Sequence, residues 1–204
     1  TRAGDHVSAP MVIDSLDFSS MARLSSKEDW DRAAKALAAS AKRLEKAGAT
    51  ALLIGANSMH KVYDTVAAAV EVPVIHIAEC VAERMAAKGV KKAALIGTRN
   101  VMVESFYRQK LIARDIELLP PEMAFVDTLD RIIYDELLLG KASRQSEREL
   151  KTILTKLAHD GAEAVVLGCT ELEMVVDVDA NVLPIYDCTR IHAEAAVDWI
   201  LGGE

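Results

Sequence analysis

The 204-residue sequence has few aromatic residues, only three cysteines and no block of lysines or arginines. Aromatic residues make up 4% of the chain, while alanine, leucine and valine dominate, which favours an α/β protein over an all-β one. With a formal net charge of −7 and no basic block, the sequence is a poor candidate for binding nucleic acid or an anionic membrane. No apolar run approaches the roughly 18 residues that a membrane-spanning helix needs.

The cysteines and histidines exclude two further classes of protein. Cys80, Cys169 and Cys188 are odd in number and lack metal-type spacing, so we expect neither a disulfide framework nor a thiolate metal site. The 5 histidines have no ligand-like spacing, and we expect no metal. Free thiols are typical of a reducing compartment and no signal peptide is visible, which favours a cytoplasmic location.

Short apolar runs alternate with amphipathic segments along the chain. The runs are continuous, as expected of strands that are buried on both faces of a parallel sheet. Amphipathic helices are expected from a capping box at residues 25–28 to Gly48, and from Ser146 to Gly161. This alternation predicts an α/β fold of mostly parallel sheets flanked by helices. The predicted strands are Met11–Leu16, Ala51–Gly55, Val72–Ile77, Ala93–Gly97, Ala164–Gly168 and Leu183–Tyr186.

An internal repeat is the most informative feature of the sequence. Residues 46–55 read against residues 159–168, with two glycines of each copy in register. Further on, residues 72–76 match residues 183–187. The distance in sequence between these two segments is two residues shorter than that between residues 46–55 and 159–168. Each copy reads as a helix end, a tight turn, a buried strand, a glycine and a polar loop. Duplication explains the repeat most simply, and the general resemblance among α/β sequences is the alternative.

The repeat predicts two pseudo-symmetric lobes, residues 1–77 together with 185–204, and residues 78–184. Ligands of parallel sheets bind beyond the carboxyl ends of the strands, so we expect the active site in the crevice between the lobes. Matching loops follow the repeated strands at residues 55–60 and 168–172. Both loops begin with glycine and open a helix, whose free N–H groups favour a bound carboxylate.

Cys169, in the second of these loops, is the candidate nucleophile or base. A thiol at a helix N-terminus has a lowered pKa, because the helix dipole favours the thiolate. Packing in the core is the other interpretation of a lone cysteine after a buried strand. Asn57, Ser58 and Thr170 are expected to add side-chain donors for the substrate.

These residues resemble two motifs of the aspartate/glutamate racemase superfamily. GCTEL at 168–172 resembles its second-lobe catalytic motif, and NSMHK at 57–61 resembles its first-lobe motif. Thr98 lies where that family places a substrate-binding threonine, and residues 187–193 resemble the segment that enters its last helix. The resemblance covers nearly the whole chain and is closest to the broad-specificity amino-acid racemases.

The resemblance implies an activity and a mechanism. The substrate would be a small amino acid, aspartate or glutamate, and the enzyme would use no pyridoxal phosphate or other cofactor and form a homodimer. In that family two thiols face the α-carbon from opposite sides. One, as thiolate, removes the α-proton and the other returns a proton, while nearby donors stabilise the carbanion.

Ala56 departs from the family pattern. The family carries its first acid/base residue, usually cysteine, directly before the residue equivalent to Asn57, and the repeat spacing likewise pairs Ala56 with Cys169. Alanine carries no exchangeable proton, so we expect racemisation to be impaired in this chain. Engineered inactivation, natural loss of racemisation and one-base chemistry of the arylmalonate decarboxylase kind are the open explanations. A two-lobed small-ligand binder without catalysis is a further alternative.

Four more candidate site residues have two interpretations each. Arg23 either binds the distal carboxylate of the substrate or is a solvated loop arginine. His60 either assists proton transfer or packs in the core. Glu171 either orients Cys169 or complements the helix dipole. Thr98 either binds substrate or caps the following helix.

The remaining features have simpler interpretations. Cys80 and Cys188 match no motif and are interpreted as packing residues, and His76 and Asp187 as buried, hydrogen-bonded groups behind the site. By comparison with the family, we expect this sequence to begin after the family's first strand, glycine-rich loop and following helix.

Overall fold

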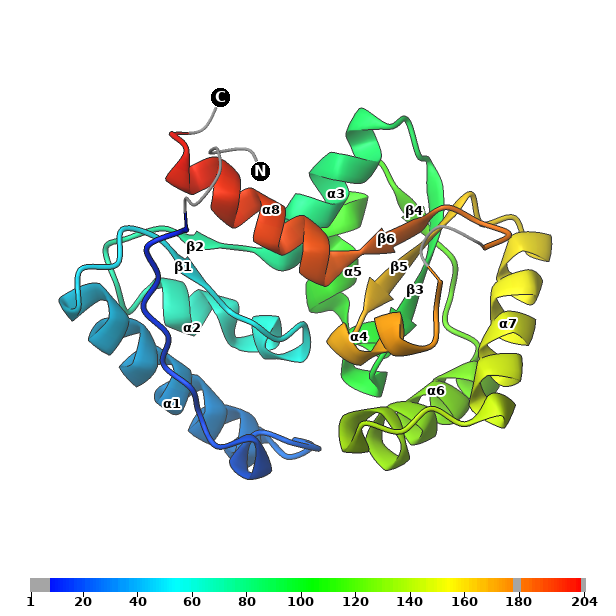
Figure 1. Ribbon diagram of the computed structural model, residues 1–204, viewed down its shortest axis with the longest axis horizontal. Helices are drawn as coiled ribbons and strands as arrows, with labels where there is room; N and C mark the ends of the chain where they lie inside the picture. Colours follow the sequence, from blue (N-terminus) through cyan, green and yellow to red (C-terminus); the bar gives the residue numbers. More distant parts are fainter. Residues whose placement is uncertain (1–7, 178–180, 203–204) are drawn as a thin grey trace. The chain divides into compact units, whose positions relative to one another are not determined.

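The computed structural model describes residues 8–177 and 181–202. These residues form two compact units (Figure 1). The first comprises the described residues up to Ile54, Met59–His76, and those from Ala193 on; the second comprises Gly55–Ser58 and Ile77–His192. Both units contain parallel strands and helices, which confirms the predicted α/β class. Among the described residues, no helix combines the length and hydropathy required to cross a membrane.

The first unit contains a two-stranded parallel sheet and the contacting helices α1 and α2. Its sheet pairs Leu52 with Val74 and Leu53 with Ile75. Its elements, in chain order, are η1 (Phe18–Ser20), α1 (Lys27–Lys46), β1 (Leu52–Leu53), the 3₁₀ helix η2 (Ser58–Val62), α2 (Tyr63–Ala67) and β2 (Val74–Ile75).

The capping box of α1 is formed by Ser26 and Asp29, one residue later in the sequence than the predicted box at residues 25–28. The hydroxyl of Ser26 accepts a hydrogen bond from the backbone N–H of Asp29 at 3.1 Å, and the Asp29 carboxylate accepts one from the backbone N–H of Ser26 at 3.3 Å. This reciprocal pair satisfies donors that the first helical turn leaves free. The helix ends just before Gly48, whose φ of 96° is in the left-handed region that favours glycine.

The prediction of a strand at Met11–Leu16 is wrong, because this segment has no regular secondary structure and pairs with no strand among the described residues. Met11 and Ile13 are 73% and 79% exposed. Asp14 ties the segment to α1 instead: its carboxylate accepts hydrogen bonds from Ser40 Oγ at 2.9 Å and Arg43 Nε at 2.8 Å. These side-chain contacts with a helix replace the backbone ladder that a strand requires.

The second unit contains a four-stranded parallel sheet with the strand order β4-β3-β5-β6. Strands β3 and β5 pair over five residues, from Ala93 opposite Ala164 to Gly97 opposite Gly168. The two-residue strand β4 was not predicted from the sequence. Residues 185–204 were predicted to belong to the first lobe, but β6 pairs with β5 in this sheet, and of them only the residues from Ala193 on belong to the first unit. The strands are β3 (Lys92–Gly97), β4 (Glu117–Leu118), β5 (Ala164–Gly168) and β6 (Ile185–Asp187).

Helices cover both faces of this sheet (Figure 1). Side chains of β3 and β5 alternate between two hydrophobic clusters, so both strands are buried on each side. One cluster joins the sheet to α6 and α7, and the other joins it to α3, α5 and the start of α8. The helices of this part of the chain are α3 (Ile77–Ala87), α4 (Arg99–Val103), α5 (Ser105–Ile112), α6 (Met123–Asp135), η3 (Leu137–Leu139), α7 (Arg144–His159), η4 (Thr170–Met174) and α8 (Cys188–Ile200).

The two copies of the sequence repeat have the same local structure. In each copy a glycine with positive φ follows the helix and precedes a strand. The N–H of Leu52 donates to the carbonyl of Pro73 at 2.9 Å, and the N–H of Val165 donates to the carbonyl of Pro184 at 2.9 Å. The repeated residues therefore make equivalent backbone hydrogen bonds in both units.

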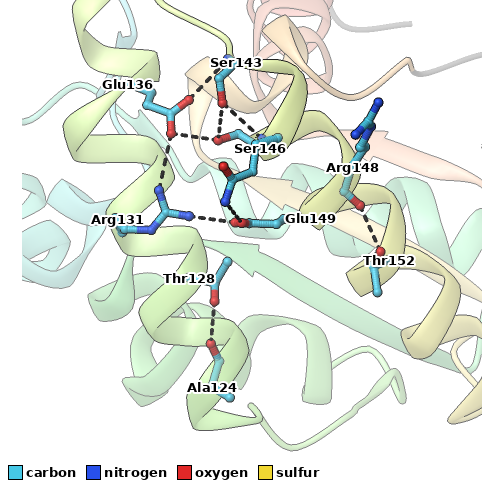
Figure 2. Close-up of polar contacts among 10 residues, drawn as sticks. Ala124, Thr128, Arg131, Glu136, Ser143, Ser146, Arg148, Glu149 and Thr152 are labelled. Atoms are coloured by element: carbon cyan, nitrogen blue, oxygen red, sulfur yellow. Dashed lines mark hydrogen bonds and ion pairs between the residues drawn. The ribbon is translucent and has the colours of Figure 1, made fainter.

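Glu136 links the end of α6 to the start of α7 (Figure 2). Its carboxylate accepts hydrogen bonds from Ser146 Oγ at 2.7 Å, from the Ser143 N–H at 3.2 Å and from Arg131 Nη1 at 3.3 Å. These contacts lower the pKa of the Glu136 carboxyl, and the hydrogen bond from Ser146 has the largest effect. Ser143 also caps α7, so this helix begins at Arg144 and not at the predicted Ser146.

Replacing Glu136 with glutamine should lower stability in a pH-dependent way. Because the folded-state pKa is below the ordinary value of 4.5, the carboxylate contributes stability above that value and loses it as the pH falls through the folded-state pKa. We expect E136Q to unfold at a lower urea concentration than the unchanged protein at neutral pH, and the difference to shrink on acidification. E71Q, at an exposed glutamate, is the control. A difference that grows as the pH falls would contradict this account.

Candidate active site

Two glycines bring the ends of β3 and β5 together. Gly97 pairs with Gly168, so Thr98 and Cys169 leave adjacent strands at the same edge of the sheet. A Cβ at Gly97 would lie 2.7 Å from the backbone carbonyl oxygen of Gly168, closer than side chains approach in proteins. The absence of a side chain at Gly97 therefore allows the close approach that positions Thr98 and Cys169.

The Cys169 thiol is paired with the carboxylate of Glu171. Cys169 Sγ donates a hydrogen bond to Glu171 Oε2 at 3.0 Å, and Thr170 Oγ1 donates to the same oxygen at 2.6 Å. Cys169 is only 8% exposed and belongs to the hydrophobic cluster beneath α6 and α7. Thr170 and Glu171 open the short helix η4, directly after β5. Three consecutive residues thus form a small hydrogen-bonded group at the carboxyl end of the sheet.

The expected lowering of the Cys169 pKa is wrong. Burial raises the pKa of this thiol well above its ordinary value, and the charge and hydrogen bond of the Glu171 carboxylate raise it further. The backbone N–H of Glu171 acts in the predicted direction, but its effect is smaller. The free protein therefore holds Cys169 as a neutral thiol, which is suited to donate a proton.

Thr98 makes no capping hydrogen bond to α4, although it precedes the helix directly. Its Oγ1 is buried and has no hydrogen-bond partner among the described residues. Buried hydroxyl groups usually have a partner. The capping interpretation of Thr98 is therefore wrong, and its hydroxyl remains available for a bound molecule.

The segment Gly55–Ser58 belongs to the second unit and carries Ala56 and Asn57. Asn57 is 4% exposed, and its Nδ2 donates to Cys188 Sγ at 3.1 Å. Its Oδ1 is buried without a partner in the described part of the chain. Cys188 was predicted to be a packing residue, and its contact with Asn57 was not foreseen, because no motif links two residues so far apart in the sequence. Ala56 and Ser58 are both half-buried.

His60 and Arg23 belong to the first unit. His60 is 2% exposed, and its ring centroid lies 4.6 Å from that of His76. The Tyr63 ring also lies 4.6 Å from His76, so the three rings form one cluster, in which both histidines are buried and Tyr63 is half-buried. Arg23 is exposed in a turn, with a φ of 52°. Within residues 8–177 and 181–202, no three side chains of metal-ligating type come together.

Sequence and structure comparisons define the family. The model of the Asp/Glu/hydantoin racemase family matches residues 1–196, and the chain belongs to this family. A candidate Asp/Glu racemase from Yersinia pestis is 36% identical, with a TM-score of 0.89 over 98% of this chain and 87% of that one. PH1733, an aspartate racemase homologue from Pyrococcus horikoshii OT3, is 29% identical, with a TM-score of 0.82 over 97% and 86%. The broad specificity amino-acid racemase RacX of Bacillus subtilis (strain 168) is 24% identical over 173 residues, which are 85% of this chain and 74% of RacX.

A methyl group at Gly97 should separate the ends of β3 and β5. Because the obstacle is the backbone of Gly168 and not a flexible side chain, we expect G97A to lower the free energy of unfolding by about 1–3 kcal/mol in urea titrations. G55A is the matched control, since a Cβ at Gly55 meets no atom within 4 Å. Equal losses in the two variants would contradict the close-approach argument.

Removing the charge of Glu171 should lower the pKa of Cys169. In E171Q burial still raises this pKa, but the repulsion between thiolate and carboxylate is gone. We expect the pH profile of iodoacetamide alkylation at Cys169, followed by mass spectrometry, to move to lower pH. E173Q, at an exposed glutamate of the same short helix, should leave the profile unchanged. An unchanged profile in E171Q would show that Glu171 does not control the thiol.

Proposed function

We propose that this protein binds a small acidic amino acid, aspartate or glutamate, and exchanges its α-proton through Cys169 without pyridoxal phosphate. The observation that carries the proposal is the buried Cys169 thiol, which donates to Glu171 at the carboxyl end of the sheet. Family membership supports racemase chemistry, and the relatives named above include an aspartate racemase homologue and an amino-acid racemase.

The proposed reaction begins with a proton transfer from Cys169 to Glu171. The α-ammonium group of a bound substrate favours this step, because a nearby positive charge stabilises the thiolate. The thiolate then removes the α-proton, and the electron pair left on the α-carbon delocalises into the substrate carboxylate. Hydrogen-bond donors at the ends of the strands, the Thr98 hydroxyl among them, stabilise that charge.

Ala56 limits the outcome of this reaction. With no acid at residue 56, the carbanion regains a proton from Cys169 on the face from which it was removed, which restores the same enantiomer. The thiol exchanges its proton with water, so the product acquires solvent hydrogen without inversion. The protein would thus retain one competent face of a two-base racemase.

Nuclear magnetic resonance in deuterium oxide tests this proposal. We expect one enantiomer of aspartate or glutamate to gain deuterium at the α-carbon, with little racemisation, and C169A to abolish the exchange. A56C or A56T should raise racemisation by about 10²-fold or more, because it restores a second acid/base group. C80A is the control for a cysteine outside the site.

Full racemisation by the chain with Ala56 would contradict the one-face mechanism. Aspartate or glutamate binding without any exchange would favour the non-catalytic binder over the enzyme. Homodimerisation and a cytoplasmic location stay predictions, and light scattering of the purified protein tests the first.

A one-cysteine decarboxylase is the second candidate. The raised pKa of Cys169 favours it, because decarboxylation produces a carbanion that needs only a proton donor on one face. A substituted malonate would lose CO₂, and the Cys169 thiol would protonate the remaining carbanion. Release of CO₂ from an arylmalonate, abolished in C169A, together with no exchange of amino-acid α-protons, would select this function.

A further inference from the structure

The side chain of Asn57 has two ends in different environments. Its Nδ2 donates to Cys188 Sγ at 3.1 Å, and its Oδ1 has no hydrogen-bond partner among the described residues. Asn57 is 4% exposed and Cys188 is fully buried. An amide oxygen is only an acceptor, so the unpaired end of Asn57 requires a donor.

Cys188 is well placed to hold the amide. It is the first residue of α8 and packs in the cluster with α3 and α5. Asp187 stabilises this helix start, since its Oδ1 accepts from the N–H groups of Thr189 at 2.9 Å and Arg190 at 3.4 Å. Burial raises the pKa of Cys188 to about 12, so its sulfur remains a thiol and accepts the amide hydrogen bond.

Another unpaired polar group lies on a neighbouring segment. The hydroxyl group of Thr98, after β3, is also buried without a partner in the described part of the chain. Strand β3 ends at the edge of the sheet that carries Cys169. Buried polar groups are normally satisfied, and unpaired ones beyond the ends of parallel strands are typical of a ligand site.

We propose that Cys188 is a positioning residue: its sulfur orients the Asn57 amide so that Oδ1 accepts a hydrogen bond from the α-ammonium group of the substrate. The inference rests on the proposed amino-acid substrate and assigns the group that recognises its ammonium. It also revises the sequence-based expectation that Asn57 donates to the carboxylate, because the amide donor is already used by Cys188.

Calorimetric binding of aspartate and succinate tests this assignment. Succinate has both carboxylates but no ammonium group. We expect the preference for aspartate to fall by about 10-fold or more in C188A and N57L, because a hydrogen bond to a charged group is lost. C188S, which retains an acceptor, should keep more of the preference than C188A. N57D retains an acceptor for the ammonium group and should keep the preference.

Two binding results would overturn the proposal. The first is a C188A variant with the preference of the unchanged protein. The second is an N57D variant whose affinities for aspartate and succinate fall by the same factor. That result would mean that Nδ2 of Asn57 faces a carboxylate of the ligand. If the unchanged protein binds no aspartate, glutamate or other amino acid, both this proposal and the proposed function fail.

A ligand-free measurement separates the two proposals. In the ¹⁵N-resolved spectrum of the free protein, we expect the side-chain amide protons of Asn57 to change chemical shift and to exchange faster with water in C188A. In C80A we expect their chemical shifts and exchange rates to be unchanged. An Asn57 amide that is unaffected in C188A would overturn the positioning role, while exchange at Cys169 would leave the proposed function intact. Should C188A fail to fold, C188S and the two Asn57 variants provide the same comparison.

Discussion

The pairing of β3 with β5 is the constraint on which the candidate site depends. Five residue pairs fix the register of these strands, and the last pair is Gly97 with Gly168. A register shift of one residue would exchange the faces on which their side chains lie and disrupt the packing of both hydrophobic clusters. The hydrophobic clusters on both faces therefore also fix where Thr98 and Cys169 leave the sheet. The stability of the fold and the geometry of the site have the same physical origin.

The environment of Cys169 shows how local charge and burial oppose the effect of a helix N-terminus. The N–H group of the short helix does favour the thiolate, but the apolar surroundings and the adjacent Glu171 carboxylate favour the thiol more strongly. Slow alkylation of Cys169 would consequently be compatible with an enzyme as well as with a binder. A substrate that brings positive charge would change this balance only when bound, which protects the free thiol from side reactions.

The sequence predicted most of the second unit correctly because its strands are continuous apolar runs. Ala164–Gly168 was predicted with its observed bounds. The family motifs indicated Asn57 and Cys169 as candidate site residues, and their roles stay a prediction. Met11–Leu16 has a similar composition, but a strand also needs a neighbouring strand, which the sequence pattern does not reveal. The hydrogen bond between Asn57 and Cys188 and the burial of Cys169 depend on contacts between distant segments. They could not be predicted from periodicity.

The path of the chain through the two units has a consequence for synthesis. The chain passes from one unit to the other at residues 54–55, 58–59, 76–77 and 192–193. No continuous stretch of sequence therefore contains either unit alone. On the ribosome the four-stranded sheet cannot be completed until β6 has been made, and the first unit needs residues that are synthesised later still. A nascent chain would remain without its Cys188–Asn57 contact until Cys188 had emerged, so the candidate site cannot be assembled before the start of α8 has been synthesised.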